Sequence, residues 1–104
     1  MYISRLYFYS SPSKTLALEQ KLKDLLEMAA KAGGKNCKIL RAHFASPGTP
    51  DVIFEQEAID LKSLEDQINK VMKAADFQKW SEQTSTLLEH SPKREVYLVV
   101  EQSK

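Results

Sequence analysis

The sequence predicts an α+β fold in which a four-stranded antiparallel sheet carries its helices on one face. Two observations predict this fold: the chain reads twice as strand–helix–strand, and a proline–glycine turn joins the two units. A single domain, residues 1–104, is long enough to bury one modest core. The predicted elements are Tyr2–Tyr9, Lys14–Ala32 and Cys37–Ala45 in the first unit, and Asp51–Glu57, Leu61–Glu89 and Glu95–Glu101 in the second.

The first helical run has recognisable start and stop signals. Ser11 is a candidate N-cap, and Pro12 suits the first helical position. Gly33-Gly34 ends the run, because glycine adopts the left-handed closing conformation without steric cost. Apolar residues recur on one face at helical spacing, at Leu18, Leu22, Leu25, Leu26 and Ala29.

A turn and a second helical stretch follow. Pro47-Gly48 suits the central positions of a type II turn, which makes a hairpin of the two extended runs around it. Asp60 is a candidate cap for the stretch Leu61–Glu89. Asp76 could restart or kink this stretch, so the sequence leaves open whether it is one helix or two. His90-Ser91-Pro92 ends it, since the residue before a proline avoids helical geometry.

This order of elements is the split βαβ arrangement of ferredoxin-like folds. Right-handed crossovers place the first and third strands in the centre of the sheet, with the helices over one face. Alternation along the strands then separates two sets of side chains. The set predicted to lie under the helices is Tyr2, Leu6, Phe8, Leu40, Ala42, Phe44, Val52, Phe54, Val96, Leu98 and Val100. The opposite set is Ile3, Arg5, Tyr7, Tyr9, Ile39, Arg41, His43, Ile53, Glu55, Tyr97, Val99 and Glu101.

The opposite set is too apolar to face water alone. It combines three isoleucines, a valine and three tyrosines with charged residues. A contiguous apolar patch of this kind usually marks an interface or a binding site. We therefore expect a homodimer in which two copies pack sheet to sheet with two-fold symmetry. The charged residues would pair across that interface or line a cavity within it.

Composition and charge exclude several classes of protein. Hydrophobic residues make up 42% and charged residues 28% of the chain, as in ordinary globular proteins. The net charge of +1 gives no field that attracts nucleic acid or an anionic membrane. The sequence also shows no secretory signal and no apolar run near the ~18 residues of a membrane helix. With one cysteine and no internal disulfide, we expect a cytoplasmic protein without nucleic-acid or membrane partners.

The chain resembles the dimeric α/β-barrel superfamily in its element order, its length and its half-apolar second sheet face. The segment Asp76-Phe77-Gln78-Lys79-Trp80 before a final Arg94-Glu95-Val96-Tyr97 strand carries the same resemblance. The superfamily includes antibiotic-biosynthesis monooxygenases, haem-degrading monooxygenases, stress-responsive barrel proteins and NIPSNAP-like proteins. The resemblance covers nearly the whole chain and is one of pattern. It implies a homodimer whose sheets form a barrel, with a pocket in each subunit between sheet and helices, and no particular reaction.

The resemblance does not extend to a haem site. Haem-degrading members use an asparagine on the first strand, a tryptophan on the second helix and a histidine further along. This chain has Trp80 and His90, but its first strand has no asparagine. Phe77 matches the phenylalanine that follows the tryptophan in those enzymes, so Trp80 falls nearer their histidine position. The two histidines and one cysteine also lack metal-ligand spacing, so no cofactor and no metal are expected.

The sequence identifies no catalytic residue, since it contains no nucleophile motif such as G-x-S-x-G. The candidates for a ligand pocket are Tyr7, Arg41, His43, Trp80 and Tyr97. Polar and aromatic residues of this kind orient a substrate and stabilise an oxyanion in cofactor-independent monooxygenases. Three of them also have a purely structural interpretation. Trp80 then packs in the core, His43 is a hydrogen-bonded interface residue, and Arg41 forms a salt bridge across the dimer.

Two functions follow as alternatives, and the sequence leaves open whether the chain is an enzyme. The leading interpretation is a homodimeric α/β-barrel protein that binds a small organic molecule, with a cofactor-independent, monooxygenase-like reaction as its extension. The alternative is a non-catalytic interaction or stress-associated protein whose second sheet face serves only dimerisation. An RNA-recognition module is excluded, because the third strand, Asp51–Glu57, is acidic and repels phosphate.

Overall fold

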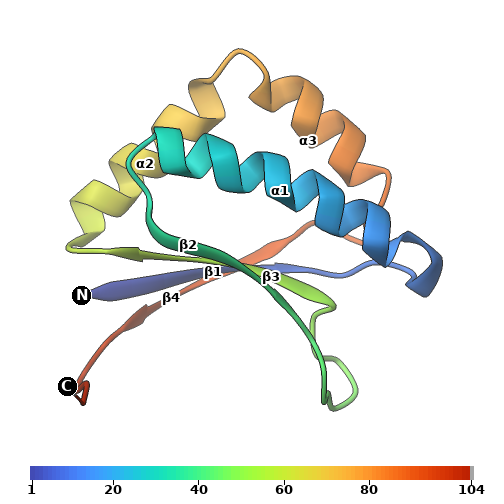
Figure 1. The fold of residues 1–104 in the computed structure, drawn as a ribbon, viewed down its shortest axis with the longest axis horizontal. Helices are drawn as coiled ribbons and strands as arrows, with labels where there is room; N and C mark the ends of the chain where they lie inside the picture. The colour runs from blue at the N-terminus through green and yellow to red at the C-terminus, as the bar shows by residue number, and fades with distance from the viewer. Residues whose placement is uncertain (104) are drawn as a thin grey trace.

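Three helices lie on one face of a four-stranded antiparallel sheet (Figure 1). The computed structural model describes residues 1–103. The predicted α+β, ferredoxin-like architecture is confirmed. In chain order the elements are β1 (Tyr2–Phe8), the 3-10 helix η1 (Pro12–Lys14), α1 (Thr15–Lys31), β2 (Lys35–Arg41), β3 (Val52–Ala58), α2 (Leu61–Lys73), α3 (Phe77–Ser85) and β4 (Lys93–Leu98).

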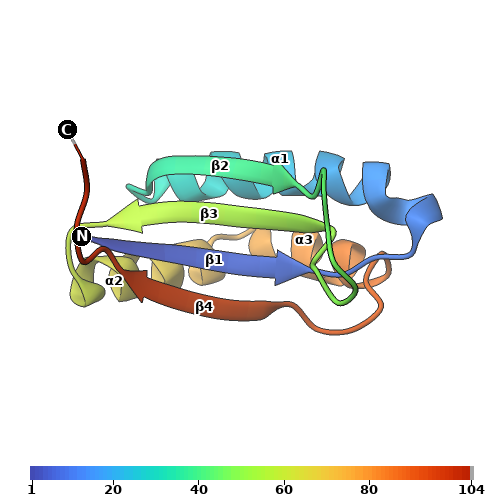
Figure 2. The same ribbon diagram turned by 90° about the horizontal axis from the view of Figure 1, so that it is seen from below.

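The strand order in the sheet is β2-β3-β1-β4, and each neighbouring pair is antiparallel. β1 and β3 are therefore central, as right-handed crossovers require. Figure 2 shows β2 and β4 at the two edges, with α1 behind the β2 side and α2 and α3 behind the β4 side. This division of the helix layer determines where the sheet is fully covered and where space remains.

The core lies between α1 and the central strands. The register places Leu6 opposite Phe54 and Phe8 opposite Val52, so their side chains share the helix-covered face. α1 supplies apolar residues at spacings of three and four, which form one stripe of the helix. The buried cluster consists of Phe8, Leu18, Leu22, Leu25, Ala29, Val52 and Phe54.

The predicted faces are correct for β1, β3 and β4 and reversed for β2. Ile39 and Arg41 lie opposite the core residues Phe54 and Val52, so they project on the helix-covered face. Leu40 therefore projects from the open face of the sheet, where the prediction had placed Ile39 and Arg41.

The reversal has a local cause. The pairing of β2 with β3 is irregular between Lys35 and Lys38, where Asn36 adopts a left-handed conformation with φ 48°. Ile39 and Leu40 are adjacent and both apolar, so alternation alone does not choose between the two faces. The strand also ends at Arg41, earlier than predicted.

The stretch Leu61–Glu89, left open by the sequence, forms two helices. Ala74 leaves the helical conformation with ψ 143° and ends α2. α3 starts after Asp76 and ends at Ser85. The chain therefore bends between Ala74 and Asp76, and this bend lets both helices follow the β1–β4 side of the sheet (Figure 2).

Local turn and cap chemistry follows the predictions in part. The carboxylate of Asp60 accepts a hydrogen bond from the backbone N–H of Ser63 at 2.7 Å and caps α2. Gly33 at φ 95° ends α1, and Gly48 at φ 88° occupies the turn between β2 and β3. Ser11, predicted to cap the first helix, instead precedes the 3-10 turn η1 and makes no side-chain capping bond.

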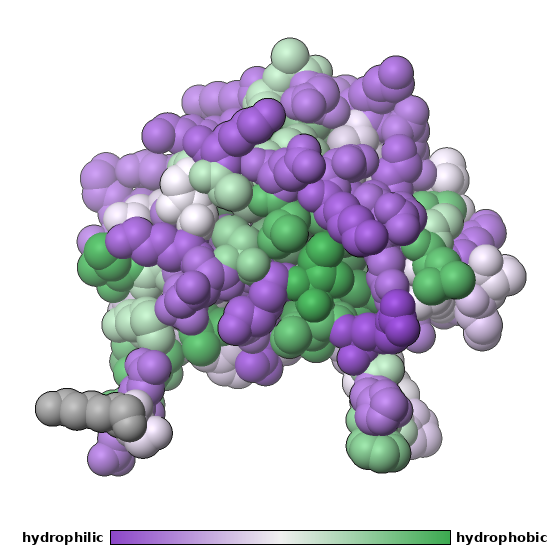
Figure 3. Space-filling model, viewed as in Figure 1, coloured by the Kyte–Doolittle hydropathy of each residue, from purple (hydrophilic) through white to green (hydrophobic). Residues whose placement is uncertain are grey.

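The open face of the sheet is flanked by two projections. The β2–β3 connection and the segment after β4 extend below the sheet, on the side away from the helices (Figures 1 and 3). Figure 3 also shows polar side chains over the helices and an apolar zone where the helix layer meets the sheet. Within residues 1–103, no helix combines the length and the apolar character needed to span a membrane.

Truncating Leu22 tests the assigned core. Leu22 is fully buried, so Leu22→Ala should lower the free energy of unfolding by about 2–5 kcal/mol through lost packing and the space left behind. Leu16→Ala, on the outer side of the same helix where Leu16 is 70% exposed, should change it by at most about 0.5 kcal/mol. Urea denaturation followed by circular dichroism measures both, and equal losses would contradict this core.

Candidate functional site

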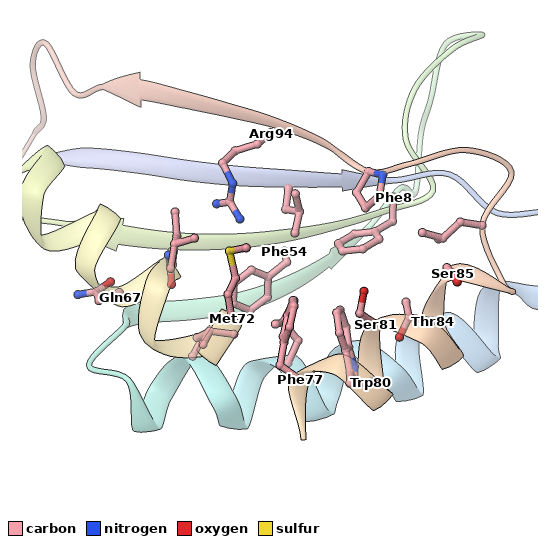
Figure 4. A pocket seen from close by; sticks show the side chains of 18 residues that line it. Phe8, Phe54, Gln67, Met72, Phe77, Trp80, Ser81, Thr84, Ser85 and Arg94 are labelled. Atoms are coloured by element: carbon pink, nitrogen blue, oxygen red, sulfur yellow. The ribbon is translucent and has the colours of Figure 1, made fainter. Parts of the chain in front are cut away.

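A partly open cavity of about 210 Å³ lies between the sheet and helices α2 and α3 (Figure 4). The sheet supplies Phe8 and Phe54, α2 supplies Met72, and α3 supplies Phe77 and Trp80. These large apolar side chains point toward one another across the space (Figure 4). The cavity therefore has the predominantly apolar and aromatic walls that are typical of small-molecule sites.

Trp80 is fixed in the cavity wall by a hydrogen bond. Its indole N–H donates to the backbone carbonyl of Lys21 in α1 at 2.7 Å. Its ring also packs against Phe77, with centroids 5.6 Å apart and planes tilted by 31°. Because the indole N–H is already bonded, Trp80 offers the cavity an apolar ring rather than a hydrogen-bond donor.

Several polar residues from four elements line the same cavity. The hydroxyl of Thr84 is buried, and within residues 1–103 it has no hydrogen-bond partner. The side-chain carbonyl oxygen of Gln67 also has no partner among these residues, but its amide group lies at the edge of the cavity and points away from it (Figure 4), and its nitrogen donates to the carbonyl of Gly33 at 3.0 Å. Buried polar atoms without partners are costly and uncommon in folded proteins. The polar lining residues are Gln56, Gln67, Ser81, Thr84, Ser85 and Arg94.

Arg94 is the one charged residue among the described residues that line the cavity. It lies opposite Leu6 in the register, so its side chain leaves β4 on the helix-covered face. Arg94 is an exposed residue of the edge strand, and its guanidinium points toward the cavity (Figure 4), where Nη1 donates to the hydroxyl of the buried Ser4 at 2.7 Å. Burial lowers the pKa of the Arg94 guanidinium.

Sequence reasoning missed Arg94, although a signal for it was present. Arg94 has the same parity as Val96 and Leu98, which were assigned to the helix-covered face. A charged residue at a core-facing parity is unusual enough to mark a candidate site. Thr84 and Gln67 give no comparable signal, because their burial depends on how α2 and α3 are rotated against the sheet.

The structure does not bring the five predicted pocket residues together. Of the five, Trp80 alone lines the cavity. Tyr7 and Tyr97 meet on the open face, with their hydroxyl oxygens 3.1 Å apart. Burial, and then the hydrogen bond to Tyr97, raises the pKa of Tyr7 to about 12, so Tyr7 stays protonated at neutral pH. Whether these tyrosines border a space between two subunits stays a prediction.

The other two candidates lie outside this cavity. Arg41 forms a two-pronged ion pair with Glu19 of α1, with both N–O distances at 2.6 Å, and thereby ties β2 to the helix layer. The guanidinium of Arg41 holds the pKa of the Glu19 carboxyl below its usual range. His43 follows β2 in an exposed connection, where its ring packs edge to face on Phe44 with centroids 4.6 Å apart. Within residues 1–103, no three His, Cys, Asp or Glu side chains cluster as metal ligands would.

Comparisons with known proteins identify relatives of the fold. No protein-family model and no curated protein matches the chain. A candidate antibiotic biosynthesis monooxygenase from Nitrosomonas europaea superposes with a TM-score of 0.72 at 14% identity, covering 97% of this chain and 100% of that one. An uncharacterised NIPSNAP domain protein from Burkholderia xenovorans gives a TM-score of 0.73 at 14% identity, covering 96% and 95%.

A third solved structure is a variant of SnoaB, described as a cofactor-independent oxygenase from Streptomyces nogalater. It gives a TM-score of 0.63 at 10% identity, covering 97% of this chain and 92% of that one. Identities this low show a shared fold and leave activity undecided. The resemblance drawn from the sequence is confirmed at this level: the chain has the ferredoxin-like fold of antibiotic biosynthesis monooxygenase and NIPSNAP domain proteins.

The pair between Glu19 and Arg41 predicts a pH dependence of stability. Because the folded-state pKa of Glu19 is lowered, its stabilisation is fully present above its ordinary pKa of 4.5 and is lost as the pH falls through the folded-state value. Glu19→Gln should therefore be less stable than the wild type at pH 7, and the difference should shrink below about pH 4.5. Urea titrations at pH 7 and pH 3 measure the difference in free energy of unfolding between Glu19→Gln and the wild type.

A matched control is Glu65→Gln, which removes an exposed carboxyl from α2 that forms no ion pair with residues 1–103. Its stability should follow that of the wild type at both pH values. A constant gap between Glu19→Gln and the wild type from pH 7 to pH 3 would contradict the assigned ion pair.

Proposed function

We propose that this chain binds a small, mostly apolar organic molecule in the cavity between its sheet and helices α2 and α3. The observation that carries the proposal is a cavity with apolar and aromatic walls that a few polar residues, Arg94 among them, also border or point toward. Ligand sites combine these features, since apolar walls provide affinity and a few polar groups fix orientation. The rings of Phe77 and Trp80 offer flat surfaces that suit an aromatic ligand.

The cost of the cavity supports the same proposal. Apolar space without contents forfeits dispersion contacts that a filled core would have. A bound molecule that fills the space would restore these contacts, whereas a purely structural interior would have been filled by side chains.

A monooxygenase-like reaction without a cofactor is an extension of this proposal. It rests on the shared fold, since SnoaB is described as a cofactor-independent oxygenase. The cavity supports it in one respect, because the positive charge of Arg94 would stabilise negative charge that develops on a substrate. The described lining residues include no carboxylate, histidine or cysteine, so ligand binding is the better supported part.

We further propose that two copies pair through the open face of the sheet. This face presents apolar and aromatic side chains on adjacent strands, among them Tyr7, Leu40 and Ile53. Its buried carboxylate, Glu55, is bridged by Arg5 at 2.8 Å and by Lys38 at 3.7 Å within the same subunit. The desolvation cost of covering this face with a second sheet is lower for charges that are already paired than for isolated charges.

The projections beside the open face support a second copy as its occupant. The β2–β3 connection and the segment after β4 project from the two ends of the open face, and the space-filling view shows a hollow between them (Figure 3). A second copy related by two-fold symmetry would place its own projections around the first. The alternative function, dimerisation without a ligand, uses the same surface and differs only in leaving the cavity between sheet and helices without a role.

Ligand binding is tested with 2-naphthamide, a flat neutral probe, by titration calorimetry on the wild-type chain. Saturable binding is expected. In a separate fluorescence titration, the probe should quench the emission of Trp80, the single tryptophan. Ser81→Phe places a ring inside the cavity and should weaken binding at least about tenfold, which corresponds to about 1.4 kcal/mol.

The control variant is Gln78→Phe, on the exposed side of the same helix, which should bind the probe as the wild type does. If Ser81→Phe is folded and binds 2-naphthamide with wild-type affinity, the cavity is not the binding site. The absence of saturable binding for both 2-naphthamide and 2-naphthoate would contradict the ligand-binding function.

Dimerisation is tested by analytical ultracentrifugation. The wild type should sediment with twice the 11.9 kDa mass of one chain. Ile53→Asp introduces an unpaired charge at the centre of the open face and should weaken association at least about tenfold, since burying such a charge costs several kcal/mol. Glu65→Lys on α2 is a control that should stay dimeric. A monomeric wild type at high concentration would contradict the proposed dimer.

A further inference from the structure

The cavity has an unbalanced positive charge. The charge belongs to Arg94, whose guanidinium has five N–H donors. The side-chain hydrogen bond that it makes within residues 1–103 goes to the neutral hydroxyl of Ser4. The ion pairs among these residues join Arg5 and Lys38 to Glu55, and Arg41 to Glu19. Arg94 takes part in none of them. Arg94 is an exposed residue of the edge strand, but its guanidinium borders the apolar side chains of the cavity, where a charge is favourable only when an opposite charge compensates it.

The surroundings of Arg94 suit a ligand rather than a missing protein partner. Its guanidinium enters from β4 and points toward Met72 on the opposite wall of the cavity (Figure 4). The bond from Nη1 to the buried hydroxyl of Ser4 restrains the side chain, so the planar group is positioned before a ligand arrives. A pre-positioned guanidinium binds a carboxylate through two parallel hydrogen bonds at little further entropic cost.

We infer that the ligand of this cavity is a carboxylic acid with an apolar, ring-sized body, and that its carboxylate pairs with Arg94. The inference rests on the proposed ligand-binding function and specifies the class of ligand. The apolar body lies against Phe77 and Trp80, on the helix side of the cavity.

A single negative charge fits this site better than a double one. One guanidinium neutralises one unit of charge, and the other described lining residues are neutral. The second charge of a phosphate monoester would remain unpaired among apolar side chains, which is costly. The site therefore favours a monoanionic carboxylate over a phosphate ester of the same shape.

The experiment compares 2-naphthoate, 2-naphthamide and 2-naphthyl phosphate by titration calorimetry at pH 7 on the full chain. The first two probes have nearly the same shape and differ in charge. The wild type should bind 2-naphthoate at least about tenfold more tightly than 2-naphthamide, as one charge-assisted contact implies. It should bind 2-naphthyl phosphate more weakly than 2-naphthoate.

Two variants of Arg94 and one control variant test whether Arg94 causes the preference for 2-naphthoate over 2-naphthamide. Arg94→Gln should remove the preference for 2-naphthoate and leave the affinity for 2-naphthamide within about threefold of the wild type. Arg94→Lys retains the charge without the planar fork and should retain a reduced preference. Lys93→Gln removes the same charge from the open face of the same strand, and should keep the full wild-type preference.

The outcomes separate this inference from the proposed function. Equal affinity of the wild type for 2-naphthoate and 2-naphthamide would overturn the inference and leave the ligand-binding function standing, as would an unchanged preference in Arg94→Gln. Tighter binding of 2-naphthyl phosphate than of 2-naphthoate would also overturn the assignment to a carboxylate. If Arg94→Gln does not fold, the wild-type comparison and Arg94→Lys decide the question.

Discussion

The packing of α1 against the two central strands is the constraint on which the rest of the structure depends. Leu18 and Leu22 are fully buried, and they meet Phe8 and Val52 from β1 and β3. This contact completes most of the core on the β2 side of the helix layer. Helices α2 and α3 are then free to lie over β1 and β4 without filling all the space beneath them. The cavity exists because the core is already complete elsewhere.

The bend between α2 and α3 gives that space its chemical character. A straight helix would present one stripe to the sheet, whereas two helices joined at Ala74 direct Met72 and Phe77 into the same cavity. The hydrogen bond from Trp80 to the Lys21 carbonyl ties α3 to α1 and holds the ring in place. The aromatic wall is therefore supported by the same helix that completes the core, which makes it a rigid surface for recognition.

The sequence predicts the fold well and the site poorly, for identifiable reasons. Element order and turn residues determine the topology, and alternation assigns three strands because Arg5, Glu55 and Glu95 mark the open face in each. It fails on β2, where Ile39 and Leu40 are adjacent and the strand is irregular near Asn36. Trp80 was identified by residue type. Arg94 was identifiable by parity, but the burial of Thr84 depends on helix packing, which no local pattern encodes.

The place of Arg94 on an edge strand links recognition to local folding. All six residues of β4 keep substantial solvent exposure, so the strand is held mainly by its backbone bonds to β1. Strands of this kind open locally at a lower free energy than the core does. When β4 detaches, the cavity loses both a wall and its only described charge. Apparent affinity is then the intrinsic affinity scaled by the fraction of molecules with β4 docked, and an occupied cavity would in turn hold that strand in place.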